Sequence, residues 1–378
     1  MLRAEKFNAK YPIKPLGEVV DFLDNLRKPI KASDRVDGEY PYYGANGLQG
    51  FINDFIFDEP LVLLAEDGGH FGNPEKTIAY IAEGKYWVNN HAHVLKPKDG
   101  LDLKFLCRVL ENYDVSPFIK GATRAKLTKG DAFTIPIPFP SFAEQKRIAA
   151  ILDKADSLRR KNQQAIQLAD QFLRAVFLDM FGDPVTNPKG WQKEPLANHF
   201  KIGTGGTPSR AIQENYGGNI PWVKTTEVCG RLILETGEAL TERGLADSNC
   251  KVYPIGSLII AMYGQGKTRG QCGILGLEAS TNQACAVLEP SETLEMNFVY
   301  QYIKYSYDQL RELSRGGNQP NLNLSLVKSF EVMIPDKKLQ IHFSNIFLRV
   351  QEILKQSNDF KDDNLFNSLS QKAFAGEL

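Results

Sequence analysis

The chain has 378 residues, 42% of them hydrophobic, which is typical of a globular protein large enough for two or three domains. Its 45 basic and 45 acidic residues cancel, so any affinity for nucleic acid must come from local patches. Five cysteines without a C-x-x-C pair disfavour a disulfide framework and a zinc site, and the short apolar runs disfavour a membrane span or signal peptide. We therefore expect a cytoplasmic protein.

The first 140 residues are predicted to form a mixed α+β domain. EPLVLLAE (59–66) and KTIAYIAEG (76–84) have the pattern of strands, and DLKFLCRVLENY (102–113) has that of a helix. The alternation in FTIPIPF (133–139) predicts a closing strand.

A long helix follows, and its start is strongly marked. Two prolines end the preceding strand, Ser141 can cap the helix, and Glu144 completes an S-x-x-E capping box. Apolar residues then recur at steps of three and four, with one polar exception, as in a coiled-coil seam. This predicted seam consists of Ile148, Ile151, Ala155, Leu158 and Asn162.

The second half of the chain repeats the first. YPIKPLGEVV at 11 and WQKEPLANHF at 191 (191 − 11 = 180) both place an aromatic residue four positions before Pro-Leu. Proline-aromatic pairs at 41–42 and 221–222 have the same offset. Further matches are LLAEDGG (63–69) with IIAMYGQ (259–265), NNHAHVLKP (89–97) with TNQACAVLEP (281–290), and GATRAKL (121–127) with GGNQPNL (316–322).

A second long helix is predicted to close this half, after a helical stretch at 296–314. Its seam consists of Phe343, Ile346, Val350, Ile353 and Ser357. Because a long one-sided helix must bury its stripe, we expect the two helices to pair with each other. The predicted fold is α+β, with two globular domains (1–140 and 183–335) separated by a long antiparallel two-helix coiled coil (141–182 and 336–378) and a pseudo-twofold internal repeat.

Motifs for catalysis or metal binding are weak. GQGKT (264–268) resembles a phosphate loop, but Ala261 stands where the pattern needs glycine. His91 and His93 would share one face of a strand, yet no third ligand stands nearby, and the corresponding residues of the second half are taken as Gln283 and Cys285. We therefore predict no metal site.

A nuclease is the alternative from another class. Asp67, Glu83 and Lys85 have the loose spacing of a Mg²⁺-dependent nuclease site, in which carboxylates hold the ion and a lysine assists the attacking water. A scaffold without DNA contact is the third possibility.

Loops suited to nucleic acid occur in both halves. KGATRAKLTKG (120–130) has four basic residues and no acidic one, so it can neutralise phosphates. GQGKTRGQ (264–271) and SRGGNQPNL (314–322) combine glycines with basic residues, which suit guanine, and with amides, which suit adenine. The predicted DNA-binding residues are Tyr42, Tyr43, Asn46, Lys76, Lys120, Arg124, Lys126, Arg210, Trp222, Lys224, Lys267, Arg269, Arg315, Asn318 and Gln319.

Over essentially its whole length the chain resembles the specificity subunit of type I restriction-modification systems. The resemblance rests on the helix entry IPFPSFAEQKRIAAIL (137–152), its end MFGDP (180–184), the segment Ile-Pro-Trp at 220–222 and the tail SLSQKAFAGEL (368–378). The second helix entry, IPDKKLQIHF (334–343), departs from the pattern because it lacks the second proline and the acidic residue.

The resemblance implies a non-catalytic DNA-binding subunit. Each recognition domain would read one half of a bipartite, asymmetric target in double-stranded DNA, and the helix pair would set the spacer between the halves. The implied partners are two modification subunits, which methylate adenine, and ATP-driven restriction subunits. The chain itself would hold no cofactor, since S-adenosylmethionine, ATP and Mg²⁺ would belong to the partners.

Overall fold

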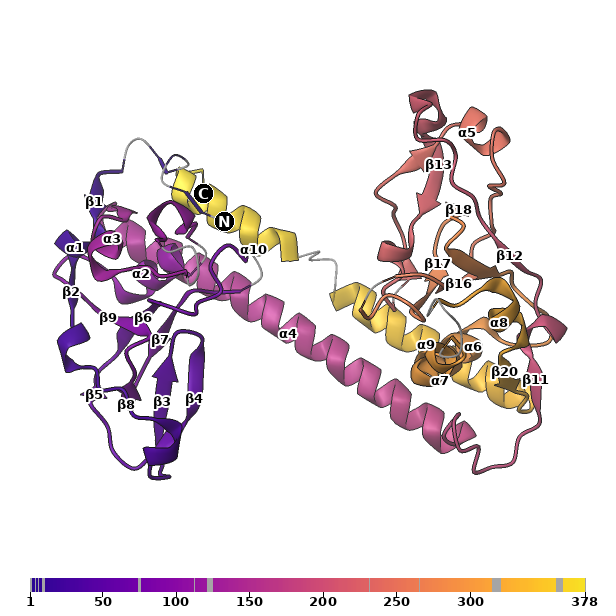
Figure 1. Ribbon diagram of the computed structural model, residues 1–378, viewed down its shortest axis with the longest axis horizontal. Helices are drawn as coiled ribbons and strands as arrows, with labels where there is room; N and C mark the ends of the chain where they lie inside the picture. Colours follow the sequence, from indigo (N-terminus) through magenta and orange to yellow (C-terminus); the bar gives the residue numbers. More distant parts are fainter. Residues whose placement is uncertain are drawn as a thin grey trace. The chain divides into compact units, whose positions relative to one another are not determined.

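The computed structural model describes residues 2–3, 5, 7–8, 11–73, 76–111, 113–120, 125–230, 232–264, 266–314, 321–357 and 363–377 (Figure 1). The chain divides into two compact units. Unit 1 comprises Met1–Gln164 and Asn358–Leu378, and unit 2 comprises Ala165–Ser357. Among the described residues, no helix is long and apolar enough to cross a membrane.

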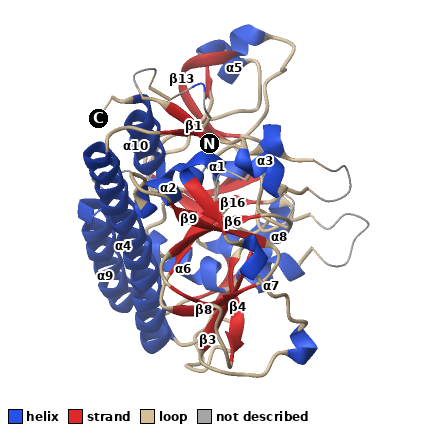
Figure 2. Ribbon diagram, turned by 90° about the vertical axis from the view of Figure 1, so that its left-hand side faces the viewer, coloured by secondary structure: helices blue, strands red, loops and turns tan. Residues whose placement is uncertain are grey.

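Unit 1 contains two four-stranded sheets. In the first, the order is β2 (Val20–Phe22), β9 (Ala92–Pro97), β6 (Leu61–Ala65) and β7 (Ala79–Ala82). In the second, it is β4 (Gly47–Ile52), β3 (Tyr40–Gly44), β8 (Lys85–Val88) and β5 (Phe57–Asp58). Strand β6 is apolar and buried at every position, as expected for an inner strand covered on both faces. Helix α2 (Leu103–Leu110) packs on the first sheet beside β6 and β9 (Figure 2).

Unit 2 has the same plan with longer connections. Its larger sheet has the order β12 (Ile202–Thr204), β19 (Cys285–Leu288), β16 (Leu258–Ala261), β17 (Cys272–Leu275) and β14 (Leu232–Ile233). Its smaller sheet has the order β15 (Ala239–Leu240), β13 (Tyr216–Val223) and β18 (Ser280–Thr281). Its helices before the closing strand are α5 (Glu242–Ala246), α6 (Met296–Tyr305), α7 (Tyr307–Glu312) and α8 (Leu324–Ser329).

Strand pairing confirms the internal repeat. Unit 1 is closed by antiparallel pairing of β1 (Ile13–Pro15) with β10 (Pro136–Pro138), and unit 2 by β11 (Lys193–Pro195) with β20 (Glu331–Met333). A parallel pair also recurs, since β3 runs parallel to β8 and β13 runs parallel to β18. Before each closing strand a short helix begins at a side-chain cap, Thr128 for α3 (Lys129–Phe133) and Asn323 for α8.

The ladder register corrects one detail of the repeat. His93 pairs with Leu64 in unit 1, and Ala286 pairs with Ile260 in unit 2. One residue earlier, Ala92 pairs with Ala65 and Cys285 pairs with Ala261. The counterpart of His93 is therefore Ala286 and not Cys285, because the sequence match is one residue out of register with the strand pairing.

Helix α4 (Phe142–Phe181) is a continuous helix of 40 residues that contributes to both units. The Ser141 hydroxyl accepts a hydrogen bond from the Glu144 amide at 3.3 Å, as predicted for the cap. In unit 1 its first half joins a core that includes Phe366 and Phe374 of α10 (Asp363–Ala375). In unit 2 its last turns pack Phe177 and Phe181 against Phe343 of α9 (Lys337–Ser357).

The predicted seam is only partly correct. Ile148 and Phe343 are buried, and Ile151, Ala155, Asn162, Ile346 and Val350 are partly buried, whereas the side chain of Ser357 lies outside what the structure describes. Leu158 and Ile353 are 46% and 58% exposed, so for them the prediction of a buried seam is wrong. The physical reason is that each unit buries the helix against its own core, and the buried stripe of α4 therefore passes through Leu152 and Asp156.

A buried glutamine fixes the start of each long helix. Gln145 Nε2 donates to the carbonyls of Pro140 and Gly100, both at 2.9 Å, and its Oε1 accepts from the Asp102 amide at 2.8 Å. Gln340 repeats the arrangement with the Pro335 carbonyl at 2.7 Å and the Glu295 amide at 2.9 Å. The P-x4-Q motif therefore connects the helix start to the loop that precedes α2 or α6.

Replacing Gln145 with alanine is expected to destabilise unit 1 by about 3 kcal/mol, because it leaves buried backbone groups without partners. Hydrogen exchange of the full chain should show faster exchange in α2 and in the first turns of α4. Gln163→Ala, at an exposed position of the same helix, should leave both segments unchanged. Equal exchange in the two variants would contradict the assigned role of Gln145.

Candidate nucleic-acid interface

Backbone hydrogen bonds connect the two ends of the basic segment of unit 1. Lys120 and Lys126 exchange backbone hydrogen bonds at 3.1 and 3.2 Å, on either side of residues 121–124. The Lys120 ammonium lies 2.5 Å from Asp131, and the Lys126 ammonium lies 3.0 Å from Glu66. Both lysines lie at the surface, but each already has a carboxylate partner, so the segment offers less uncompensated charge than its sequence suggests. Arg124 lies outside the described residues.

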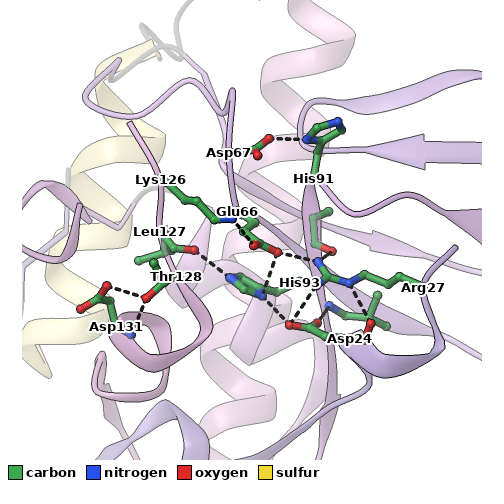
Figure 3. A network of polar contacts seen from close by, with 12 residues as sticks. Asp24, Arg27, Glu66, Asp67, His91, His93, Lys126, Leu127, Thr128 and Asp131 are labelled. Carbon is green, nitrogen blue, oxygen red and sulfur yellow. Dashed lines mark hydrogen bonds and ion pairs between the residues drawn. The ribbon is translucent and has the colours of Figure 1, made fainter. Parts of the chain in front are cut away.

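A buried ionic network lies beneath this segment (Figure 3). The His93 side chain is 0% exposed, its Nδ1 lies 2.7 Å from Asp24 Oδ2, and its Nε2 lies 2.9 Å from the Leu127 carbonyl. A carbonyl and a carboxylate only accept hydrogen bonds, so both ring nitrogens face acceptors, an arrangement in which a doubly protonated ring donates two hydrogen bonds. Burial raises the pKa of the Asp24 carboxyl, but the hydrogen bond and charge of His93 outweigh it and hold that pKa below its usual value.

Arg27 and Lys126 complete the network. Arg27 Nη1 donates to Glu66 Oε2 and to the Ala92 carbonyl, both at 2.7 Å, and its Nη2 lies 3.4 Å from Asp24. Burial raises the pKa of Glu66, but the hydrogen bonds from Arg27 and Lys126 prevail and lower it. Three basic side chains thus surround two carboxylates and connect β6 and β9 to the end of the basic segment.

The network contains residue types that bind metals, but their ligand atoms are already bonded to other protein groups. Ligand atoms of Asp24, Glu66 and His93 lie within 4.8 Å of one another. However, both nitrogens of His93 are engaged, and Arg27 already supplies a positive charge to Glu66. This donor set fits its own basic side chains better than a metal ion.

Unit 2 has an apolar counterpart of the network. The Leu127 amide donates to the Glu66 carbonyl at 2.7 Å, and the Leu322 amide donates to the Met262 carbonyl at 3.1 Å, which makes Met262 the counterpart of Glu66. Met262 and Ala286 both belong to the apolar core of unit 2. The same backbone junction is therefore held by ions in one unit and by apolar packing in the other.

Two predicted contact residues are core residues. Tyr42 and Trp222 are each 1% exposed, so the prediction that they touch DNA is wrong. The Tyr42 hydroxyl contacts the backbone of Ile30, and the Trp222 indole donates to the Gly206 carbonyl at 3.2 Å.

Each of these buried rings supports an arginine. The Arg35 guanidinium lies 3.9 Å from the ring centroid of Tyr42, and that of Arg210 lies 5.2 Å from the ring of Trp222. Because Tyr42 pairs with Trp87 in β8 and Trp222 pairs with Ser280 in β18, the two rings occupy matching positions of the repeat. The aromatic residues therefore hold candidate contact residues in place.

Arg210 and Lys224 share one acidic partner. They lie 2.6 and 2.7 Å from the Glu238 carboxylate. The hydrogen bond from Arg210, followed by that from Lys224, lowers the pKa of Glu238 to about 2. Both predicted contacts are thus positioned at the surface with part of their charge compensated.

The other predicted contacts are dispersed. Tyr43 packs against two neighbouring tyrosines, Asn46 donates to the Gly68 carbonyl at 2.9 Å in the turn after β3, and Lys76 is exposed. Lys267 is exposed and Arg269 half-buried in a turn held by α7, through hydrogen bonds to their carbonyls. Arg315, Asn318 and Gln319 lie outside the described residues.

The alternative nuclease site is not assembled. Asp67 contacts His91, and Lys85 lies over the ring of Phe55 at 4.6 Å. Glu83 stands exposed in the turn between β7 and β8. Among the described residues, the one cluster of three side chains able to hold a metal includes neither Asp67 nor Glu83.

The fold and these surfaces define a protein with two copies of one α+β domain, each bearing its own set of polar and basic side chains. Residues 8–168 and 188–359 match the family described as type I restriction modification DNA specificity domain. The chain belongs to this family.

Its relatives carry the same description. The chain is 43% identical over 145 residues to a putative type I restriction enzyme specificity subunit of Haemophilus influenzae, a match covering 38% of this chain and 37% of that protein. It is 24% identical to the MjaIX specificity subunit of Methanocaldococcus jannaschii over 71% of this chain and 67% of the relative. The crystal structure of an S subunit from M. genitalium has the same fold, with a TM-score of 0.70, 16% identity and 97% of each chain covered.

Proposed function

We propose that the chain is the DNA-specificity subunit of a type I restriction-modification complex, in which each unit reads one half of a bipartite, asymmetric target. The observation that carries this proposal is that the two units share one pattern of strand pairing but differ in their surface side chains. The closing strands and the buried glutamines recur in both units, whereas the surface cations differ. In unit 1 Arg35 lies on the ring of Tyr42, and in unit 2 Arg210 and Lys224 lie against the Glu238 carboxylate. Two domains of one fold with different surfaces suit two half-sites of different sequence.

The spacer between the half-sites is set by the long helices. Helix α4 belongs to both units, and its 40 residues correspond to about 60 Å of helix. A continuous helix resists bending more than an irregular linker of the same length does. Its length therefore supports a role in fixing the separation of the two recognition domains along the DNA.

The proposed partners supply the chemistry. Two modification subunits would bind S-adenosylmethionine and methylate adenine, and restriction subunits would use ATP and Mg²⁺, while this chain holds no cofactor and catalyses no reaction. Leu168 and Phe172, one turn apart on α4, are exposed apolar residues, which supports this helix as one surface for these partners.

Sequencing of methylated adenines tests the proposal directly. A host carrying the modification subunits with this chain is expected to methylate a bipartite motif that disappears when this chain alone is removed. Cleavage of DNA by the purified chain with Mg²⁺, abolished in Glu83→Ala, would instead favour the nuclease. An identical methylated motif with and without the chain would overturn the proposal.

A further inference from the structure

Each unit has a surface hollow whose lining includes polar side chains. The hollow of unit 1 has a volume of about 420 Å³, and its lining includes Arg35, Gln49, Asn89, Asn90 and His91. The hollow of unit 2 has a volume of about 610 Å³, and its lining includes Gly206, Thr207, Asp247, Asn249 and Gln283. Both linings include groups that donate and accept hydrogen bonds, and that of unit 1 also includes Ile30 and Tyr42.

The two hollows occupy matching places in the repeat. Asn90 stands two residues before Ala92, which pairs with Ala65, and Gln283 stands two residues before Cys285, which pairs with Ala261. Asn90 and Gln283 are therefore structural counterparts, and both are exposed carboxamides on the loop that enters an inner strand. Opposite this loop, each hollow is lined by the segment that follows β2 or β12.

Neighbouring contacts hold both carboxamide loops in place. The buried Asn89 donates to Gln49 Oε1 at 3.1 Å and accepts from the His91 amide at 2.8 Å, which fixes the backbone around Asn90. In unit 2 the Thr207 hydroxyl donates to Gln283 Oε1 and orients the amide. Such preorganisation reduces the conformational entropy lost when a ligand binds.

In each unit an arginine lies on an aromatic ring that is connected to the hollow. Arg35 lines the hollow of unit 1 and lies on Tyr42. Arg210 is not part of the lining of the other hollow; its guanidinium lies 4.4 Å from the ring centroid of Tyr216 and 5.2 Å from that of Trp222, and its Nη1 donates to Glu238. The Trp222 indole connects it to that hollow, because it donates to the carbonyl of Gly206 in the lining. A stacked guanidinium keeps its planar donor fork in one orientation, which suits guanine O6 and N7, and a carboxamide suits adenine N6 and N7.

We propose that the two hollows are the base-reading surfaces, with Arg35 and Asn90 as specificity-determining residues of unit 1 and Arg210 and Gln283 as those of unit 2. This inference rests on the proposed function and names the side chains that carry it. The remaining lining residues differ between the two hollows. His91 of unit 1 has Ala284 as its counterpart in unit 2, and the hollow of unit 2 is also lined by Asp247. The two units therefore read different bases.

The test uses the assembled methylation complex and sequencing of methylated adenines. Asn90→Ala is expected to relax discrimination at a base position of one half-site by roughly 10- to 100-fold and to leave the other half-site unchanged. Gln283→Ala is expected to do the same in the other half-site. Asn53→Ala and Asn198→Ala, exposed carboxamides outside the hollows, should leave the motif unchanged.

Arg35→Lys separates base reading from charge. It keeps the positive charge but loses the planar fork, so it should relax one base position while the dependence of DNA binding on salt stays as in the wild type. Unchanged discrimination in both carboxamide variants, or an equal loss of methylation on all sequences, would overturn this inference. If the wild-type chain does not determine the motif at all, the proposed function fails instead.

Discussion

His93→Ala is expected to lower the free energy of unfolding of unit 1 by about 3 kcal/mol or more, because breaking a buried ion pair strands the remaining charge. Asp24 would lose its 2.7 Å partner, and the Leu127 carbonyl would lose its donor. Hydrogen exchange of the full chain should report the change as lost protection in β6 and β9. The equivalent strands of unit 2, β16 and β19, serve as an internal reference.

The apolar junction of unit 2 suggests a matched control. His93→Ala combined with Glu66→Met copies Ala286 and Met262 and leaves Arg27 beside Asp24. This double variant should be less destabilised than His93→Ala, since it removes a buried carboxylate together with a buried cation. Protection of β6 and β9 in His93→Ala equal to that in the wild type would show that the network contributes nothing to stability.

The network also gives unit 1 a defined response to acid. The pKa values of Asp24 and Glu66 are lowered in the folded chain, so their stabilisation is present above the unfolded-state values of about 4 and is lost as the pH falls through the folded values. Unit 1 should therefore lose stability below about pH 4. In the variant with Glu66→Met and His93→Ala this acid-dependent loss should be smaller.

Shortening both long helices by seven residues is expected to change the spacer of the methylated motif while leaving both half-sites unchanged. The deletions are 157–163 in α4 and 351–357 in α9. Seven residues correspond to about 10 Å of helix, or at most about 3 base pairs, and turn the flanking segments by only about 20°. Sequencing of methylated adenines measures the spacer and the half-sites in one experiment.

A control separates helix length from helix surface. Alanine replacements at Ser157, Lys161 and Gln163 keep the length of α4 and alter exposed positions in the deleted stretch, so the spacer should stay as in the wild type. A shortened chain that methylates the original motif with its original spacer would rule out the helices as the element that sets the distance. Altered half-sites would point to damage within the recognition domains.

Sequence patterns predicted the elements of the fold well where local signals are strong. The apolar run at 61–65 forms β6, the cap at Ser141 precedes α4, and the stretch at 296–314 forms α6 and α7. The helix seam was harder to predict, because periodicity shows that a stripe is buried but not what covers it. Leu158 and Ile353 fit the period and yet are exposed, since α4 and α9 pack into the cores of the units.

The candidate interface was less predictable from the sequence. Tyr42 and Trp222 look like contact residues because aromatics beside basic residues suit nucleic acid, whereas their burial follows from strand pairing across the chain. The ionic network joins residues from positions 24 to 127, too far apart for a local motif. The sequence match of LLAEDGG with IIAMYGQ already set Glu66 against Met262, but only the strand register sets His93 against Ala286.

The pairing of β1 with β10, and of β11 with β20, places the entry and exit of each globular part side by side. If the globular part between such a strand pair were replaced by another domain of this fold, the new domain would join the rest of the chain only at these two strands, next to the buried glutamine of the following helix. Exchange of a whole globular domain could therefore change the DNA sequence preference of such a chain, while the long helices stay the same.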